Sequence, residues 1–156
     1  MFKMKRPNFI LSDNTKNKIA SKIYNGFQRN FDDTDIGLTD IVNIIESANE
    51  YNNGYELAKE LESNTCCDID MLIVEVLDGI GEEIRREKEK MLIDWVEKNN
   101  IQPLFNLGDN VVYKNKNMFI NGHYKNKALY KVGEIISSQS NWLVPYEKIE
   151  YEQEKI

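Results

Sequence analysis

Apolar residues recur at helical spacing through the first two thirds of the chain. Ile19, Ile23, Phe27 and Phe31 stand four positions apart, which places them on one face of a predicted helix over 12–31. Similar apolar stripes predict further helices over 39–51, 55–63 and 68–99. The pattern therefore predicts a helical bundle of four or five helices.

The longest of these segments leaves two questions open. Gly79 and Gly81 interrupt the stripe over 68–99 and indicate a kink or a break into two helices. The apolar run Met71 to Leu77 fits a buried strand as well as a helix when it is taken alone. We favour a helix, because the periodic pattern continues for about eight turns.

The pattern changes after Pro103. Short apolar runs at 111–113, 128–136 and 142–144 predict β-strands. Asn121-Gly122 predicts a two-residue hairpin turn, because both residue types tolerate a positive φ. The tail from Glu147 alternates charged and apolar residues, and we expect it to fray.

Three short motifs follow one another in this last third of the chain: Gly108-Asp109-x-Val111-x-Tyr113, Val132-Gly133-Glu134-Ile135-Ile136 and Trp142-Leu143-Val144. They resemble the strands of SH3-like barrels, including those of the KOW type. The resemblance implies a small antiparallel barrel or a curled sheet, since so few short strands are not stable as an open sheet in water. We therefore expect an α+β protein with an acidic helical domain over 1–102 and a small SH3-like β domain over 103–156.

Charge is strongly segregated along the chain. The net charge is −6. Residues 1–31 carry seven Lys/Arg and one Asp, whereas residues 32–104 carry 19 acids and six bases. Residues 105–156 are close to neutral, with seven bases and six acids. Such asymmetry is typical of proteins with charged partners, although solvated helix faces also produce it.

The acidic stretch predicts one candidate binding face. Packed helices would hold its carboxylates at fixed spacing, and such an array can imitate a phosphate backbone and enter a cationic groove of another protein. The residues of this predicted acidic face are Asp32, Asp33, Asp35, Asp40, Glu46, Glu50, Glu56, Glu60 and Glu62.

A second candidate face is basic. Lysines interleave with aromatic residues between 113 and 131, and this combination suits nucleic acid, where bases stack and phosphates pair with cations. The same aromatic residues are also typical of a barrel core. The residues of this predicted basic face are Lys114, Lys116, Tyr124, Lys125, Lys127 and Lys131.

The sequence offers no recognisable catalytic, metal or cofactor motif. His123 is the single histidine and follows a predicted turn, with no nucleophile or orienting acid near it in sequence. Cys66 and Cys67 are adjacent, a poor geometry for a disulfide or a metal site. Asp33-x-Asp35-x-Gly37 lacks the later ligands of a calcium loop, and no phosphate-binding glycine motif occurs. We therefore expect a protein that is not an enzyme.

Membrane insertion and export are not indicated. No apolar run approaches the length of about 18 residues that a membrane span requires, and the start lacks a signal-peptide core. Adjacent cysteines and the absence of a glycosylation sequon favour a cytoplasmic location, which is the host bacterial cytoplasm if the protein is phage-encoded.

The chain as a whole resembles small accessory proteins encoded by phages or mobile elements of low-GC bacteria, in its size, its many Asn, Ile and Lys residues, its acidic helices and its lack of a catalytic motif. The resemblance implies an inhibitor of host defence, most sharply an anti-CRISPR protein whose acidic face blocks a CRISPR effector nuclease or its guide-RNA complex. Two alternatives stay open. One is a nucleic-acid-binding regulator that uses the basic first 31 residues and the β domain, and the other is a structural or adaptor protein.

Overall fold

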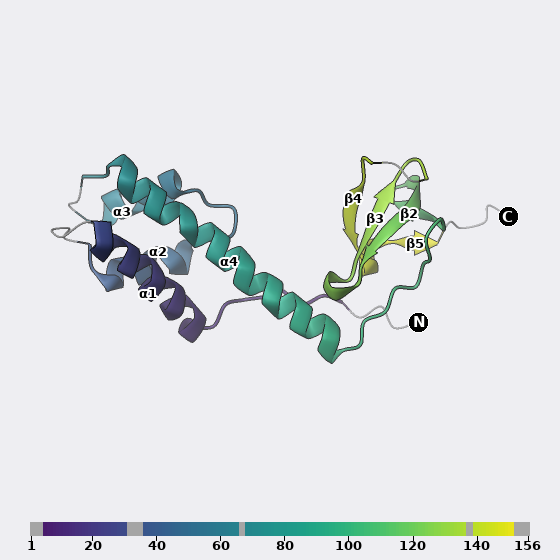
Figure 1. Ribbon diagram of the computed structural model, residues 1–156, viewed down its shortest axis with the longest axis horizontal. Coiled ribbons are helices and arrows are strands. Elements are labelled where there is room, and N and C mark those ends of the chain that lie inside the picture. The colour runs from purple at the N-terminus through teal and green to yellow at the C-terminus, as the bar shows by residue number, and fades with distance from the viewer. Residues whose placement is uncertain (1–4, 31–35, 66–67, 137–138, 152–156) are drawn as a thin grey trace. The chain divides into compact units, whose positions relative to one another are not determined.

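The protein has an α+β fold in which helices precede a small antiparallel sheet (Figure 1). The computed structural model describes residues 5–30, 36–65, 68–136 and 139–151. The helices are α1 (Asp13–Asn30), α2 (Leu38–Ser47), α3 (Gly54–Asn64) and α4 (Met71–Lys98). The strands are β1 (Asn110–Tyr113), β2 (Lys116–Tyr124), β3 (Leu129–Gly133), β4 (Trp142–Pro145) and β5 (Glu150–Tyr151), with short 3₁₀ helices η1 (Lys125–Lys127) and η2 (Tyr146–Lys148). The predicted fold class is confirmed.

The chain divides into two compact units whose boundary differs from the one predicted at residue 102. The helical unit comprises residues 9–90, and the sheet unit comprises residues 1–8 and 91–156. The boundary lies inside α4, because the last turns of that helix supply Val96 to the apolar core of the sheet, with Leu92 and Trp95 packed against it. A helix can serve two cores when its apolar stripe is long enough.

Apolar stripes build the helical unit as predicted. Ile19, Ile23 and Phe27 of α1 are buried, and so are Leu77 and Ile80 of α4. Each such side chain contributes about 1.5–3 kcal/mol when it leaves water. Phe31, the fourth residue of the predicted stripe, lies outside the described residues.

Gly79 and Gly81 do not break α4, which is continuous from Met71 to Lys98. A Cβ on Gly79 would lie 3.5 Å from Cδ1 of Ile23, and one on Gly81 would lie 2.8 Å from the carbonyl oxygen of Asn52. Gly81 therefore allows the loop before α3 to pack closely on α4, whereas a Cβ on Gly79 would make only an ordinary contact with Ile23. The alternative of a strand over 71–77 is wrong.

The sheet has the order β4-β3-β2-β1-β5, and neighbouring strands are antiparallel. It is open rather than a closed barrel, since β4 and β5 stand at opposite ends of this order. Val111 pairs with Tyr151, and Val112 with Glu150. Contrary to the expectation that the tail frays, its residues 150 and 151 are therefore paired in the sheet. Residues 152–156 lie outside the described ranges.

The turn predicted at Asn121-Gly122 is wrong. Both residues lie inside β2, where the pairing with β3 shifts register between Ile120 and Gly122. The β1–β2 hairpin instead turns at Lys114 and Asn115, whose φ values are 50° and 62°. Positive φ at both central residues matches the twist of the flanking strands. Asn121 and Gly122 instead lie at this register shift, where β2 has one more residue than β3, as at a β-bulge.

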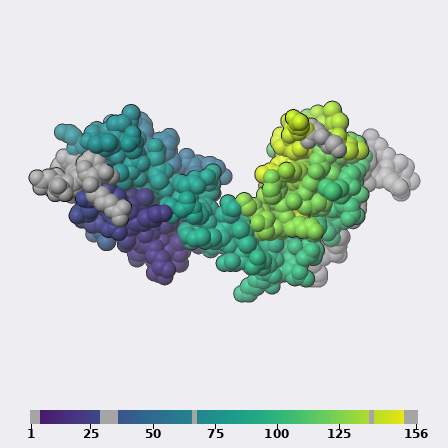
Figure 2. Space-filling view, in the orientation of Figure 1, coloured from purple at the N-terminus to yellow at the C-terminus, as the bar shows by residue number. Residues whose placement is uncertain are grey.

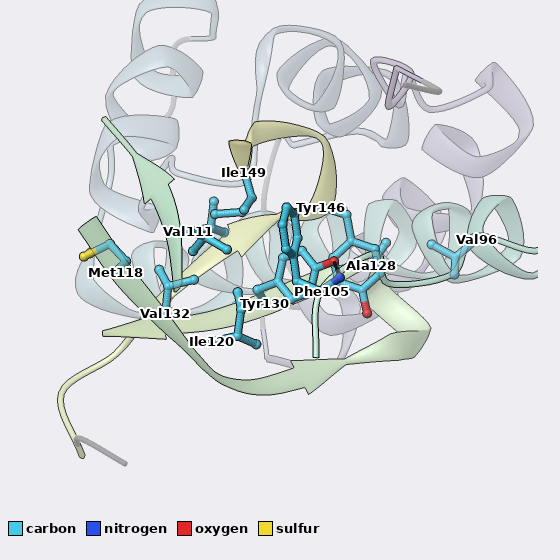
Figure 3. Close-up of a cluster of buried hydrophobic side chains, with 11 residues drawn as sticks. Val96, Phe105, Val111, Met118, Ile120, Ala128, Tyr130, Val132, Tyr146 and Ile149 are labelled. Atoms are coloured by element: carbon cyan, nitrogen blue, oxygen red, sulfur yellow. Dashed lines mark hydrogen bonds between the residues drawn. The ribbon is translucent and has the colours of Figure 1, made fainter. Parts of the chain in front are cut away.

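Tyr130 lies at the centre of the sheet unit's core (Figure 3). Its ring centroid is 4.2 Å from that of Tyr146 and 5.8 Å from that of Phe105. Its hydroxyl accepts hydrogen bonds from the backbone N–H groups of Leu104 (2.8 Å) and Phe105 (3.1 Å). These hydrogen bonds thus connect the segment that follows α4 to the middle of β3.

The basic start of the chain is partly used to hold the sheet unit together. Arg6 donates from Nη2 to the carbonyl oxygens of Lys127 (3.2 Å) and Ala128 (3.0 Å). Its Nε lies 3.1 Å from Oε1 of Glu147 in a partly buried ion pair. The Arg6 side chain therefore connects the start of the chain to η1 and η2 of the sheet unit.

Candidate functional site

The predicted acidic face is largely occupied by interactions within the helical unit. Asp32, Asp33 and Asp35 lie outside the described residues. Oδ2 of Asp40 accepts the backbone N–H of Gly37 at 2.8 Å and so caps the start of α2. A carboxylate at this place satisfies a free N–H and suits the helix dipole.

Glutamates of the same face also accept hydrogen bonds or form ion pairs within the helical unit. Glu56 closes a capping box with Asn53, accepting that residue's backbone N–H at 3.3 Å, while its own N–H donates to Oδ1 of Asn53 at 2.9 Å. Glu60 accepts the hydroxyl of Ser47 at 2.5 Å. Glu62 forms an exposed ion pair with Lys59, at 2.7 Å.

Glu50 and Glu46 complete the described part of this face. Glu50 pairs with Nζ of Lys88 at 2.6 Å, and this hydrogen bond is the main cause of the lowered pKa of the Glu50 carboxyl. Glu46 is exposed and has no ion pair among the described residues. Four of the six described acids thus cap helices or join elements, and a fifth, Glu62, pairs within α3, so the fold itself accounts for most of them.

Two tyrosines stand out beside these acids. Tyr51 and Tyr55 are 86% and 61% exposed. The loop that carries Tyr51 is fixed by its asparagines: the N–H of Tyr51 donates to Oδ1 of Asn49, and the N–H of Asn49 to Oδ1 of Asn52, both at 2.8 Å. Sequence reasoning missed this pair, although the asparagine-rich segment 49–53 signals an ordered turn.

The predicted basic face lies on the sheet unit and extends along β2. Lys114 and Lys116 lie at the β1–β2 turn, whereas Lys125 and Lys127 lie in η1, at the other end of β2. The nine residues of β2 span roughly 26 Å at the usual rise of a strand. The six predicted residues therefore lie at the two ends of β2 and on β3 rather than in a single cluster.

Two of these lysines lie over aromatic rings. Nζ of Lys114 is 5.5 Å from the ring centroid of Tyr113, and Nζ of Lys131 is 4.9 Å from that of Tyr124. Lys131 and Tyr124 share the face of the sheet opposite the core, because Tyr130 and Val132 alternate with Lys131 along β3. Each contact is an attraction between the cation and the π face.

A groove lies beside the β1–β2 turn. Its volume is about 310 Å³, and it is lined by Tyr113, Lys114, Lys116, Met118, Trp142 and Leu143. We call it the Trp142 groove. Trp142 is 50% exposed and Leu143 is 55% exposed, and both belong to β4, the strand at one edge of the sheet. The surface of β3 and β4 has the yellow-green colours in Figure 2.

Sequence reasoning placed Trp142 in a strand but not in a site. The residue is far from Lys114 in sequence, and they meet only because β4 pairs with β3, β3 with β2 and β2 with β1. One acid also lies in this region: Glu134 is 3.3 Å from Nζ of Lys116 in an exposed ion pair. Lys114 has no such ion pair among the described residues.

His123 lies in β2 and not in a turn. It pairs with Tyr130 across the strands, and the two ring centroids are 5.4 Å apart. Burial is the main cause of the lowered pKa of its imidazole, followed by the charge of Lys125. Within the described part of the chain, its buried Nδ1 has no hydrogen-bond partner, although the residue as a whole is only partly buried.

Comparisons with protein families, curated proteins and solved structures find no match for this chain. Within the described ranges, no three His, Cys, Asp or Glu side chains gather as a metal site would require. No helix among the described residues combines the length and apolar character needed to cross a membrane.

Proposed function

We propose that this protein is a non-enzymatic nucleic-acid-binding protein and that its sheet unit carries the binding surface. The observation that carries the proposal is that lysines and aromatic rings occur together on the sheet unit, both in the Trp142 groove and where Lys131 lies over Tyr124. Cations that follow a backbone, together with rings on which bases stack, are the chemistry of single-strand binding. The proposal includes the cytoplasmic location expected from the sequence.

Charge distribution supports this choice of unit. The helical unit carries 18 Asp/Glu and nine Lys/Arg, whereas the sheet unit carries 11 Lys/Arg and eight Asp/Glu. The net charges are therefore −9 and +3. A polyanion is repelled by the first unit and attracted by the second, so the helical unit directs a strand towards the sheet.

Salt dependence gives the first test. If Lys114, Lys116 and Lys131 each neutralise one phosphate, the affinity for a single strand should fall roughly 20-fold between 50 and 200 mM salt. Fluorescence anisotropy with labelled dT12 and rU12 measures it. No binding at about 100 μM protein in the lower salt, weaker than ordinary non-specific binding, would contradict the proposal.

A pair of charge-reversal variants locates the surface. Lys114→Glu with Lys116→Glu should lower the affinity for dT12 at least tenfold. Lys18→Glu with Lys22→Glu in α1 changes the net charge equally, and we expect less than a threefold loss. Equal losses would mean that only the overall charge of the molecule matters.

A second candidate function is protein binding by the helical unit, as expected for an inhibitor of a defence nuclease. The exposed Tyr51 and Tyr55 favour it, because tyrosine is enriched among the residues that dominate protein interfaces. A pull-down with CRISPR effector nucleases, with and without guide RNA, tests it. Binding that survives Tyr51→Ser with Tyr55→Ser would remove this site from consideration.

A further inference from the structure

We infer that the Trp142 groove takes one unpaired base, so that the protein selects single strands over duplexes. This inference rests on the proposed function and adds the form of nucleic acid that is recognised. Its basis is the combination of a half-exposed indole, an apolar lining and two lysines at one place.

The lining of the groove suits a flat aromatic ligand. Trp142 and Tyr113 provide rings, while Met118 and Leu143 provide apolar side chains. Met118 belongs to the buried core, so it gives the groove a fixed wall. The volume of about 310 Å³ stands at the lower end of the range for ligand pockets, which suits one ring system rather than several.

Charge completes the match. Lys114 and Lys116 line the same groove, so phosphates on either side of an inserted base would have cations within reach. Base stacking is tolerant of sequence, since every base offers a π face. A duplex would first have to unstack and unpair a base, which costs a few kcal/mol. The geometry therefore favours single strands.

An acidic peptide with apolar side chains is the competing occupant, because it would also combine apolar contacts with lysine pairing. The edge position of β4 would suit such a peptide. We favour a base because the groove combines two aromatic rings, those of Trp142 and Tyr113, with two lysines in a volume of about 310 Å³, and stacking surfaces beside cations are what single-strand binding uses.

The test compares dT12 with a 12-base-pair duplex at 50 mM salt, using the full chain. We expect the single strand to bind at least tenfold more tightly. Trp142→Ala should weaken dT12 binding about 5- to 150-fold, the loss expected when one base loses its stacking partner, and leave duplex binding unchanged. Trp142→Phe should retain most of the affinity, and circular dichroism checks that both variants fold.

A direct readout uses Trp95→Phe, which leaves Trp142 as the sole tryptophan. Its fluorescence should be quenched as dT12 saturates. Equal binding of duplex and single strand, with Trp142→Ala silent, would overturn the inference and leave the proposed function standing. If neither the parent protein nor any variant binds dT12, both the inference and the proposed function would be overturned. Quenching by a Glu/Leu-rich peptide but not by dT12 would assign the groove to a protein partner.

Discussion

The two units of this protein use charge in opposite ways. In the helical unit, where the net charge is −9, most of the described acids of the predicted face cap helices or join elements. In the sheet unit, where the net charge is only +3, Lys114 and Lys131 lie over aromatic rings, and Lys114 also lines a groove together with Lys116. The comparison teaches that the number of charged side chains is a poor guide to a binding surface. What matters is whether those side chains already make hydrogen bonds or ion pairs within the fold.

The largest expected effect is a loss of stability in the helical unit that leaves binding by the sheet unit unchanged. Gly54→Ala would drive a Cβ into the carbonyl oxygen of Val74 and the carboxylate of Asp78. We expect it to destabilise the helical unit by roughly 3 kcal/mol, measured by urea denaturation with circular dichroism. At a temperature where the variant is still folded, dT12 binding should stay within twofold of the parent.

Gly26→Ala is the matched control in the same unit. A Cβ there would lie 3.6 Å from Cγ1 of Val76, an ordinary contact. Because alanine suits a helix interior better than glycine, we expect a gain of about 0.5–1 kcal/mol. A loss as large as that of Gly54→Ala would show that the close approach of α3 to α4 is not what requires glycine.

A comparable pair of variants in the sheet unit should change its stability by smaller amounts. Tyr130→Phe removes the hydroxyl that accepts the N–H groups of Leu104 and Phe105, the second of these bonds being buried, at a cost of about 1–3 kcal/mol. Tyr146→Phe removes a buried hydroxyl that has no hydrogen-bond partner in the described part of the chain, so stability should change by less than about 0.5 kcal/mol. Equal effects in thermal melts would mean that the chain after α4 is not held by Tyr130.

The units should also respond to acid in different pH ranges. The pKa of His123 is lowered from 6.5, mainly by burial, so the folded sheet unit binds fewer protons there than the unfolded chain. Its contribution is complete above pH 6.5 and is lost as the pH falls through the folded pKa. His123→Gln should flatten stability between pH 7 and 5, and an unchanged slope would contradict the burial of this ring.

The smallest effect belongs to the helical unit. The pKa of Glu50 is lowered from 4.5, chiefly by its hydrogen bond to Lys88. This contribution is present above pH 4.5 and is lost as the pH falls through the folded pKa. Glu50→Gln should cost about 0.5–1 kcal/mol at pH 7 and less at pH 3. The same cost at both pH values would show that packing, rather than charge, is responsible.

Local patterns predicted the helices well, because the spacing of residues such as Ile19 and Ile23 already fixes which face is buried. The hairpin turn was misplaced, since Asn121-Gly122 and Lys114-Asn115 compete locally and only pairing across the sheet decides between them. For the same reason, the sequence could not join Trp142 to Lys114.

The candidate acidic face shows a different limit. The sequence counts carboxylates, but it does not say which of them are used by the fold. Asp40 and Glu56 each stand in a first helical turn, and this position could have identified them as capping groups. The pairing of Glu50 with Lys88 joins distant segments and depends on packing that no local pattern contains.

A titration of the isotope-labelled protein with dT12, followed by amide NMR spectra, tests the central claim most directly. The account predicts that the largest shifts fall on residues 113–118 and 129–143, with small changes in α2 and α3. Shifts concentrated on Tyr51, Tyr55 and the acids around them, or no saturable shifts at all, would contradict the claim that the sheet unit carries the binding surface.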